Sequence, residues 1–138
     1  MSIERFSSGG PWEARVGYSR AVRAGPHVHV AGCTGVDAAG GLVGPGDLRA
    51  QLRQAIANAE RALAMAGAAL EDVVRTRIYV TDIARWEEAA DAHAEAFGAH
   101  PPAAAMLGVS ALIDPAMLVE IEVEAWSPRK VGPPSAPP

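Results

Sequence analysis

The sequence predicts an α+β fold in which two helices cover one face of a mixed β-sheet. Two segments, near residues 46–67 and 83–97, have the three-to-four-residue apolar spacing of amphipathic helices. Three segments, at residues 27–32, 73–80 and 118–125, alternate apolar and polar residues as half-buried strands do. Because the elements run as strands, helix, strand, helix and two strands, both helices are expected on the same side of the sheet.

The helix ends are marked by capping residues. Asp47 has an N-cap side chain and Gly67 suits the position after the last turn, so the first helix should be about 30 Å long. The second helix is expected from about Ile83 to Phe97, closed by Gly98, with an apolar side made of Ile83, Trp86, Ala90 and Phe97. Trp12 and Tyr18 are expected in a loop before the strands.

The strands divide their residues between an apolar face and a polar face. The apolar face is expected to hold Val28, Val30, Val74, Thr76, Ile78, Val80, Val119, Ile121, Val123 and Ala125. The polar face is expected to hold His27, His29, Ala31, Val73, Arg75, Arg77, Tyr79, Leu118, Glu120, Glu122 and Glu124. Residues 19–23 are the expected hairpin partner of residues 27–32, across Ala24-Gly25-Pro26. Since no segment remains to cover the polar face, it is either solvated or packed against another subunit, and we favour the subunit.

The composition is that of a globular protein, with 49% apolar and 20% charged residues in a chain of 138. A domain of this length buries roughly two-thirds of the surface that its unfolded chain exposes. We expect a single domain over residues 1–126. The Pro-rich segment SPRKVGPPSAPP, residues 127–138, has no apolar periodicity and is expected to form a flexible extension.

Charge, hydropathy and cysteine content exclude several partners. The chain has 12 basic and 16 acidic residues, so we expect no nucleic-acid partner, because binding to a phosphate backbone depends on clustered Lys and Arg. No apolar run is long enough to span a bilayer, and the first residues lack the pattern of a signal peptide. The single cysteine, Cys33, cannot form an intramolecular disulfide. We therefore expect a cytoplasmic protein without a membrane partner.

The segments VGYSRAVRAG, HVHVAG, VVRTRIYVTDI and LVEIEVEAW occur in this order and span nearly all of residues 3–126. In this order and spacing they resemble the Rid family of reactive intermediate deaminases, also called the YjgF family. The resemblance implies one Rid-like domain with a chorismate-mutase-like fold. It also implies a homotrimer with small-molecule clefts between adjacent subunits, which would hydrolyse enamine and imine metabolites such as 2-iminobutanoate to ketoacids and ammonia without a cofactor.

The resemblance assigns the cleft residues position by position. The family's tyrosine matches Tyr18, its backbone contact matches Gly32, and its last-strand glutamate, which positions the attacking water, matches Glu120. The arginine that binds the substrate carboxylate should stand at Ala104, and an amide of the second helix is replaced by Ala90.

Other positions bear on the same cleft. Cys33 stands where deaminating members have an amide. Strand alternation predicts core positions at Ala103, Ala105, Leu107 and Val109, and cleft positions at Ala104, Met106, Gly108 and Ser110. With Ala104 and Met106 in it, the cleft should be wider and less cationic, which suits a larger or neutral substrate.

Most candidate residues also have a purely structural interpretation. Glu120, Glu122 and Glu124 could pair across strands with Arg75 and Arg77, and we prefer this interpretation for Glu122 and Glu124. Arg20, Arg75 and Arg77 could supply a displaced clamp, although ordinary ion pairing explains them as well. Tyr18 could cover the edge of the core.

Cysteine and histidine allow two further kinds of site. Cys33 is a nucleophile or a small apolar filler, and the filler is the commoner case. His27 and His29 share a strand face, but no third ligand is spaced with them, so no metal site is expected. His93 is expected beside the apolar side of the second helix, at its boundary with the polar side.

These observations leave three candidate functions. The first is a trimeric hydrolase that deaminates an enamine-like or imine-like metabolite without the usual arginine. The second is a non-catalytic protein that binds a metabolite on the same scaffold. Ribonuclease action is the least favoured, because the chain is acidic and shows no paired catalytic histidines.

Overall fold

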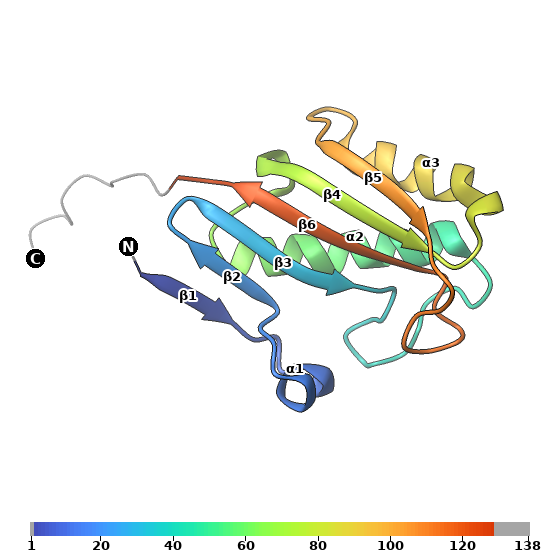
Figure 1. Cartoon of the computed structure of the whole chain (residues 1–138), viewed down its shortest axis with the longest axis horizontal. Coiled ribbons are helices and arrows are strands. Elements are labelled where there is room, and N and C mark those ends of the chain that lie inside the picture. Colours follow the sequence, from blue (N-terminus) through green and yellow to red (C-terminus); the bar gives the residue numbers. More distant parts are fainter. Residues whose placement is uncertain (1, 129–138) are drawn as a thin grey trace, which may run out of the picture.

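The computed structural model describes residues 2–128 and confirms the α+β fold (Figure 1). One sheet has the strand order β1-β2-β3-β6-β4-β5, in which β4 and β5 pair in parallel and the other neighbours antiparallel. The strands are β1 (Ile3–Phe6), β2 (Ala21–Ala24), β3 (His27–Cys33), β4 (Val73–Val80), β5 (Ala103–Gly108) and β6 (Val119–Trp126). The helices are α1 (Pro11–Val16), α2 (Leu48–Met65) and α3 (Trp86–Phe97), with short 3₁₀ turns η1 (Leu70–Asp72) and η2 (Ile83–Arg85).

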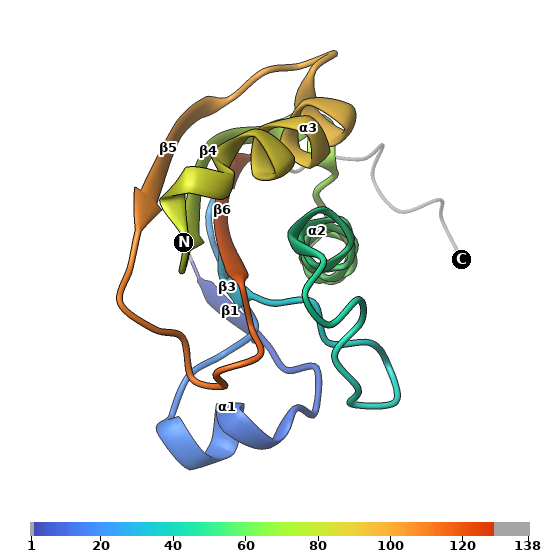
Figure 2. The same ribbon diagram turned by 90° about the vertical axis from the view of Figure 1, so that its right-hand side faces the viewer.

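The two long helices, α2 and α3, lie on the same side of the sheet (Figure 2). The core between them and the sheet is built largely from valine, alanine, leucine and isoleucine. The opposite side, which we call the open face, carries His29, Arg75, Arg77, Tyr79, Glu120, Glu122 and Glu124, and no helix of residues 2–128 covers it. Within these residues, no helix combines the length and apolar character that a bilayer crossing requires.

Helix α2 follows its predicted boundaries because both ends are capped. The Asp47 side chain accepts a hydrogen bond from the backbone N–H of Ala50, and Gly67 has a φ of 82°, in the left-handed region that favours glycine. The second helix begins later than predicted. Residues 83–85 form a 3₁₀ turn, and Ile83 and Trp86, expected on the apolar side, are about half exposed at 49% and 50%. The buried residues of α3 are instead Ala89, Ala92 and Phe97.

Two β-bulges reverse the predicted alternation. In β4 the register shifts between Val73 and Arg75, so Val73 is buried and Val74 exposed, the opposite of the prediction. In β3 the register shifts between Val30 and Cys33, so Cys33 points into the core, whereas an unbroken alternation would place it on the face of His27 and His29. Alternation predicts the remaining residues of these strands and of β6 correctly.

The predicted faces of β5 are wrong. Ala104 lies beside Thr76 and Met106 beside Ile78, so both point to the helix side of the sheet, where Met106 packs against the core. Leu107, predicted in the core with Ala103 and Ala105, is 45% exposed, and both alanines are exposed too. A run of alanines has no contrast between apolar and polar residues, so its alternation carries no information about which face is buried.

The N-terminal elements β1 and α1 were not predicted. Strand β1 has four residues, and α1 has six, which is too short for a clear periodicity. Trp12 lies in α1 rather than in a loop. At the other end, Ser127 is hydrogen-bonded through its backbone N–H to Pro26, and the remainder of the predicted extension, residues 129–138, lies outside the described residues.

Candidate functional site

Tyr18, Gly32 and Glu120 come together at one end of the open face, together with Arg20. Helix α1 ends at Gly17, whose φ of 91° turns the chain so that the N–H groups of Gly17 and Tyr18 both donate to the Glu13 carbonyl. Tyr18 and Arg20 follow in the segment that leads into β2. The Arg20 guanidinium donates to the Tyr18 hydroxyl at 3.0 Å and to the Gly32 carbonyl at 2.7 Å.

Gly32 and Glu120 are in direct contact. A Cβ atom on Gly32 would lie 2.7 Å from Glu120 Oε2 and 2.8 Å from its Cδ. The carboxyl group therefore lies over the Cα of residue 32, and any larger residue there would displace it. The carboxyl group can take this position only because residue 32 has no Cβ atom.

The three glutamates of β6 have different environments. Glu124 forms an ion pair with Arg77 at 2.8 Å, and Glu122 accepts a hydrogen bond from the Tyr79 hydroxyl. These contacts support the structural interpretation of both residues. Glu120 makes no side-chain hydrogen bond or ion pair within residues 2–128. Its partial burial, reinforced by the charge of Glu122, raises its pKa above the usual value, and the Arg20 charge opposes this only in part.

Cys33 is a buried residue rather than a cleft side chain. It is 3% exposed, and burial raises the pKa of its thiol, although the nearby Arg20 partly counteracts this. Its Sγ lies 3.5 Å from Arg20 Nη1 and 3.3 Å from the Ala31 carbonyl. A buried thiol with a raised pKa is a poor nucleophile, so the environment favours the interpretation as a small core residue.

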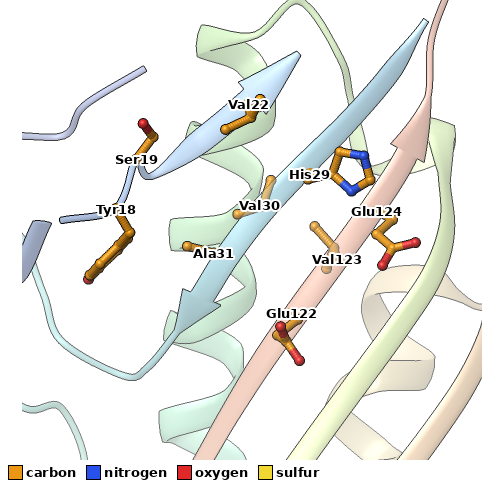
Figure 3. A pocket seen from close by; sticks show the side chains of 9 residues that line it. All are labelled: Tyr18, Ser19, Val22, His29, Val30, Ala31, Glu122, Val123 and Glu124. Carbon is orange, nitrogen blue, oxygen red and sulfur yellow. The ribbon is translucent and has the colours of Figure 1, made fainter. Parts of the chain in front are cut away.

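A shallow cavity of about 310 Å³ lies on the open face beside Tyr18. Figure 3 shows Tyr18 and Ser19 at the start of β2, His29 on β3, and Glu122 and Glu124 on β6 around it. The lining combines an aromatic ring, carboxylates and an imidazole with apolar atoms of the strands. Glu120 is two residues before the lining residue Glu122 on β6, but it does not line the cavity itself.

Ala104 and Met106 belong to a second cavity, of about 260 Å³, on the helix side of the sheet. It is also lined by Ala90 and His93 of α3 and by Ile78 of β4. Strands β4 and β6 separate β5 from β3, and the two groups of predicted site residues face opposite sides of the sheet. Within one chain the structure therefore brings Tyr18, Gly32 and Glu120 together but keeps Ala104 and Met106 apart from them.

His93 gives this second cavity its polar atom. A hydrogen bond of 2.8 Å joins its Nε2 to the hydroxyl of the fully buried Thr76, and its ring packs against Phe97 at 4.7 Å. Burial lowers the pKa of His93, so the folded state favours the neutral ring. Its boundary position agrees with the expectation from the sequence.

Acidification should therefore weaken folding through His93. The unfolded chain binds a proton on His93 more readily than the folded chain does. The stability linked to His93 is therefore fully present above the pKa of the unfolded state and is lost as the pH falls through the pKa of the folded state. Urea unfolding measured at pH 7 and at pH 5 should show that the unfolding free energy falls less between the two pH values in His93→Asn than in the parent. At pH 7 the variant should be about 1 kcal/mol less stable, because the Thr76 hydrogen bond is lost. His100→Asn, at an exposed loop position, serves as the control, and an equal loss in all three proteins would contradict the assignment.

The histidines of β3 have no metal-binding partners in the described part of the chain. His27 and His29 are exposed, and no group of three or more His, Cys, Asp or Glu side chains among residues 2–128 could hold a metal ion. His29 lies across from Glu124, where its charge helps to lower the pKa of that carboxyl after the larger effect of the Arg77 hydrogen bond.

Comparison with known proteins places this arrangement in one family. The family model described as Endoribonuclease L-PSP matches residues 11–127. The RutC family protein PH0854 of Pyrococcus horikoshii is 34% identical over 109 residues, which are 79% of this chain and 86% of that protein. A 2-iminobutanoate/2-iminopropanoate deaminase of Capra hircus is 30% identical over 111 residues, which are 80% of this chain and 81% of that protein.

A solved structure gives the same result at higher identity. Rv2704 of Mycobacterium tuberculosis, described as a member of the YjgF/YER057c/UK114 family, is 54% identical with a TM-score of 0.83. The match covers 91% of this chain and 99% of that one. The chain therefore belongs to the YjgF family, also called the Rid family, as the sequence resemblance implied.

Sequence reasoning missed the residues that support the site. Glu13 is 5% exposed and accepts hydrogen bonds from the backbone and side chain of Ser8. Burial raises the pKa of Glu13, but the hydrogen bonds from Ser8 and Ser7 outweigh it and lower that pKa overall. Arg20 was considered only as a clamp or an ion pair, yet its main contacts are backbone carbonyls. No local pattern marks a contact between residue 20 and residues 31–33.

Proposed function

We propose that the chain forms a homotrimer in which neighbouring subunits share a small-molecule cleft, and that it hydrolytically deaminates an enamine-like or imine-like metabolite. The observation that carries this proposal is Glu120. It is the β6 glutamate without a side-chain hydrogen bond or ion pair among the described residues, and its carboxyl group lies directly over Gly32. A carboxylate that is not consumed by an ion pair is available to a water molecule.

The proposed reaction adds water to a carbon–nitrogen double bond. Glu120 takes a proton from the water as its oxygen bonds to the imine carbon. That proton passes to the imine nitrogen, which gives a carbinolamine. The hydroxyl proton of the carbinolamine then moves to the same nitrogen as the carbon–nitrogen bond breaks, and a ketone and ammonia leave. A raised pKa makes Glu120 a better base near neutral pH than an ordinary carboxylate.

The positions of the predicted cleft residues support assembly from several copies. Glu120 is on the open face, whereas Ala104 faces α3 at the far edge of the sheet. A cleft that contains both can form only between neighbouring chains. The open face also exposes Leu107 at 45% and Trp126 at 53%, beside its charged residues, which suits a second copy of this chain better than bulk water.

The proposed cleft has no strong clamp for a carboxylate group of the ligand. Ala104 stands where the resemblance places an arginine, and its cavity is lined by alanines, Met106, Ile78 and the neutral His93. On the open face, Arg77 is paired with Glu124 and Arg20 is bound to backbone carbonyls. These environments favour a larger or neutral substrate over a small carboxylate.

The test is to generate 2-iminobutanoate in situ with an amino-acid oxidase and to trap the remaining imine with semicarbazide. We expect the unmodified protein to accelerate loss of the imine weakly and Ala104→Arg to accelerate it more. Ala99→Arg, an exposed substitution after α3, controls for added charge, and light scattering should give the mass of three chains. No acceleration by either the parent or Ala104→Arg, with this imine or with a larger imine that has no carboxylate, would contradict the proposed deamination and favour the non-catalytic metabolite-binding function.

A further inference from the structure

Arg20 occupies a position between the two parts of the candidate site. Its side chain is 17% exposed, so most of the guanidinium is removed from water. Nη1 donates to the carbonyls of Gly32 at 2.7 Å and of Ala31 at 3.3 Å, while Nη2 donates to the Tyr18 hydroxyl at 3.0 Å. Its Nε lies 3.7 Å from the Glu13 carboxylate. These contacts use the guanidinium as a bridge and leave it poorly suited to clamp a substrate anion.

The carbonyls that Arg20 binds belong to the β-bulge of β3. The register with β6 shifts between Val30 and Cys33, so the carbonyls of the intervening residues are displaced from regular strand pairing. Partly buried backbone carbonyls need hydrogen-bond donors, and Nη1 of Arg20 supplies both carbonyls while Nη2 of the same planar group binds Tyr18. The bulge in turn orients Gly32 toward Glu120 and Cys33 toward the core.

The hydrogen bond from Arg20 to Tyr18 determines whether the Tyr18 hydroxyl acts as donor or acceptor toward a ligand. A guanidinium has donors and no acceptor, so the oxygen of Tyr18 must accept from Arg20. The hydroxyl proton is then free to donate, and no acceptor for it lies among residues 2–128. Tyr18 lines the open-face cavity, where a ligand atom could receive that proton.

We propose that Arg20 is a positioning residue that holds the bulge at residues 31–33 and presents the Tyr18 hydroxyl as a donor to an acceptor atom of the ligand. The ligand class is therefore one with an imine nitrogen or a carbonyl oxygen at this point. The inference rests on the proposed function for its ligand, but the geometry of Arg20 can be tested without any substrate.

Three variants separate the parts of this role. Arg20→Lys keeps the charge but loses the fork, Arg20→Met removes both, and Tyr18→Phe removes only the donor hydroxyl. Arg53→Met is the control, because Arg53 pairs with Glu95 on the exposed helix surface at 2.6 Å. The lysine variant keeps the test valid if the methionine variant does not fold.

The first readouts need no substrate. Amide hydrogen exchange at residues 32 and 33 should be at least about tenfold faster in both Arg20 variants and unchanged in Tyr18→Phe and Arg53→Met. NMR titration of the labelled Glu120 carboxyl should show a higher pKa in Arg20→Met and little change in Arg20→Lys, because the arginine charge lowers this pKa in the parent. Unchanged exchange in both Arg20 variants would overturn the positioning role, whatever the enzymatic result.

The last readout uses 2-iminobutanoate. Arg20→Lys and Tyr18→Phe should each lower kcat/KM by about 10²-fold, the scale of a small misplacement in an active site. If Arg20 acts through Tyr18, the double variant should be little worse than either single one. Additive losses or full activity in Arg20→Lys would contradict the link. An inactive parent protein would contradict the proposed function, while the exchange and titration results would still decide the role of Arg20.

Discussion

Replacing Glu120 with glutamine should lower kcat/KM for 2-iminobutanoate by about 10²–10⁴-fold, the usual contribution of a general base. The same substitution should stabilise the fold at neutral pH. The folded state raises the pKa of Glu120, so the stability linked to this group is complete below the unfolded pKa and is lost as the pH rises through the folded one. A neutral amide removes this loss.

Kinetics and thermal unfolding of the same samples test both halves of this expectation. The melting temperature of Glu120→Gln should exceed that of the parent at pH 7, and the two should converge below pH 4. Glu87→Gln, at an exposed position in the first turn of α3, controls for loss of a carboxylate. Retained activity would contradict the catalytic role, and a destabilised variant at pH 7 would contradict the electrostatic one.

Replacing Gln51 with leucine should cost about 2–4 kcal/mol of unfolding free energy, because its amide satisfies several backbone groups at once. Gln51 is 0% exposed. Its Nε2 donates to the carbonyls of Gly44 and Ala116 at 3.2 Å, and its Oε1 accepts from the N–H of Leu118 at 2.9 Å. Leucine has a similar volume, so the loss would report the hydrogen bonds rather than a cavity.

Denaturant unfolding measures this cost, and Gln54→Leu provides the matched control on the same helix. The Gln54 amide donates only to the Asn58 side chain, at 3.0 Å, among the described residues. Its replacement should change stability by less than about 1 kcal/mol. Because Leu118 directly precedes β6, Gln51→Leu should also loosen the start of the strand that carries Glu120. Equal effects of the two leucine variants would contradict this account.

The sequence was informative wherever apolar and polar residues contrast. Helix α2 was located because its buried residues recur at helical spacing and because Asp47 and Gly67 are residue types that commonly stand at helix ends. The faces of β6 were predicted because valine and isoleucine alternate with glutamate. The alternation failed at Val74 and Cys33, where an inserted residue shifts the register, and no residue type at these positions announces a bulge.

The candidate site was predictable only in part. The positions of Tyr18, Gly32 and Glu120 followed from the family resemblance, and their proximity in the structure is consistent with it. The role of Arg20 depends on carbonyls more than ten residues away, which local patterns do not reveal. The direction of Ala104 depends on parallel pairing with β4, a tertiary choice that three alanines do not encode.

The alanine-rich strand β5 has a consequence for how this scaffold can change. Its first three residues are exposed at the edge of the sheet, so they contribute little to the core that holds the fold together. Side chains on such a strand can be exchanged at small cost in stability, in contrast to the buried residues of β6. We therefore expect single substitutions on β5 to change the ligand preference of the proposed cleft without disturbing Glu120 and Gly32.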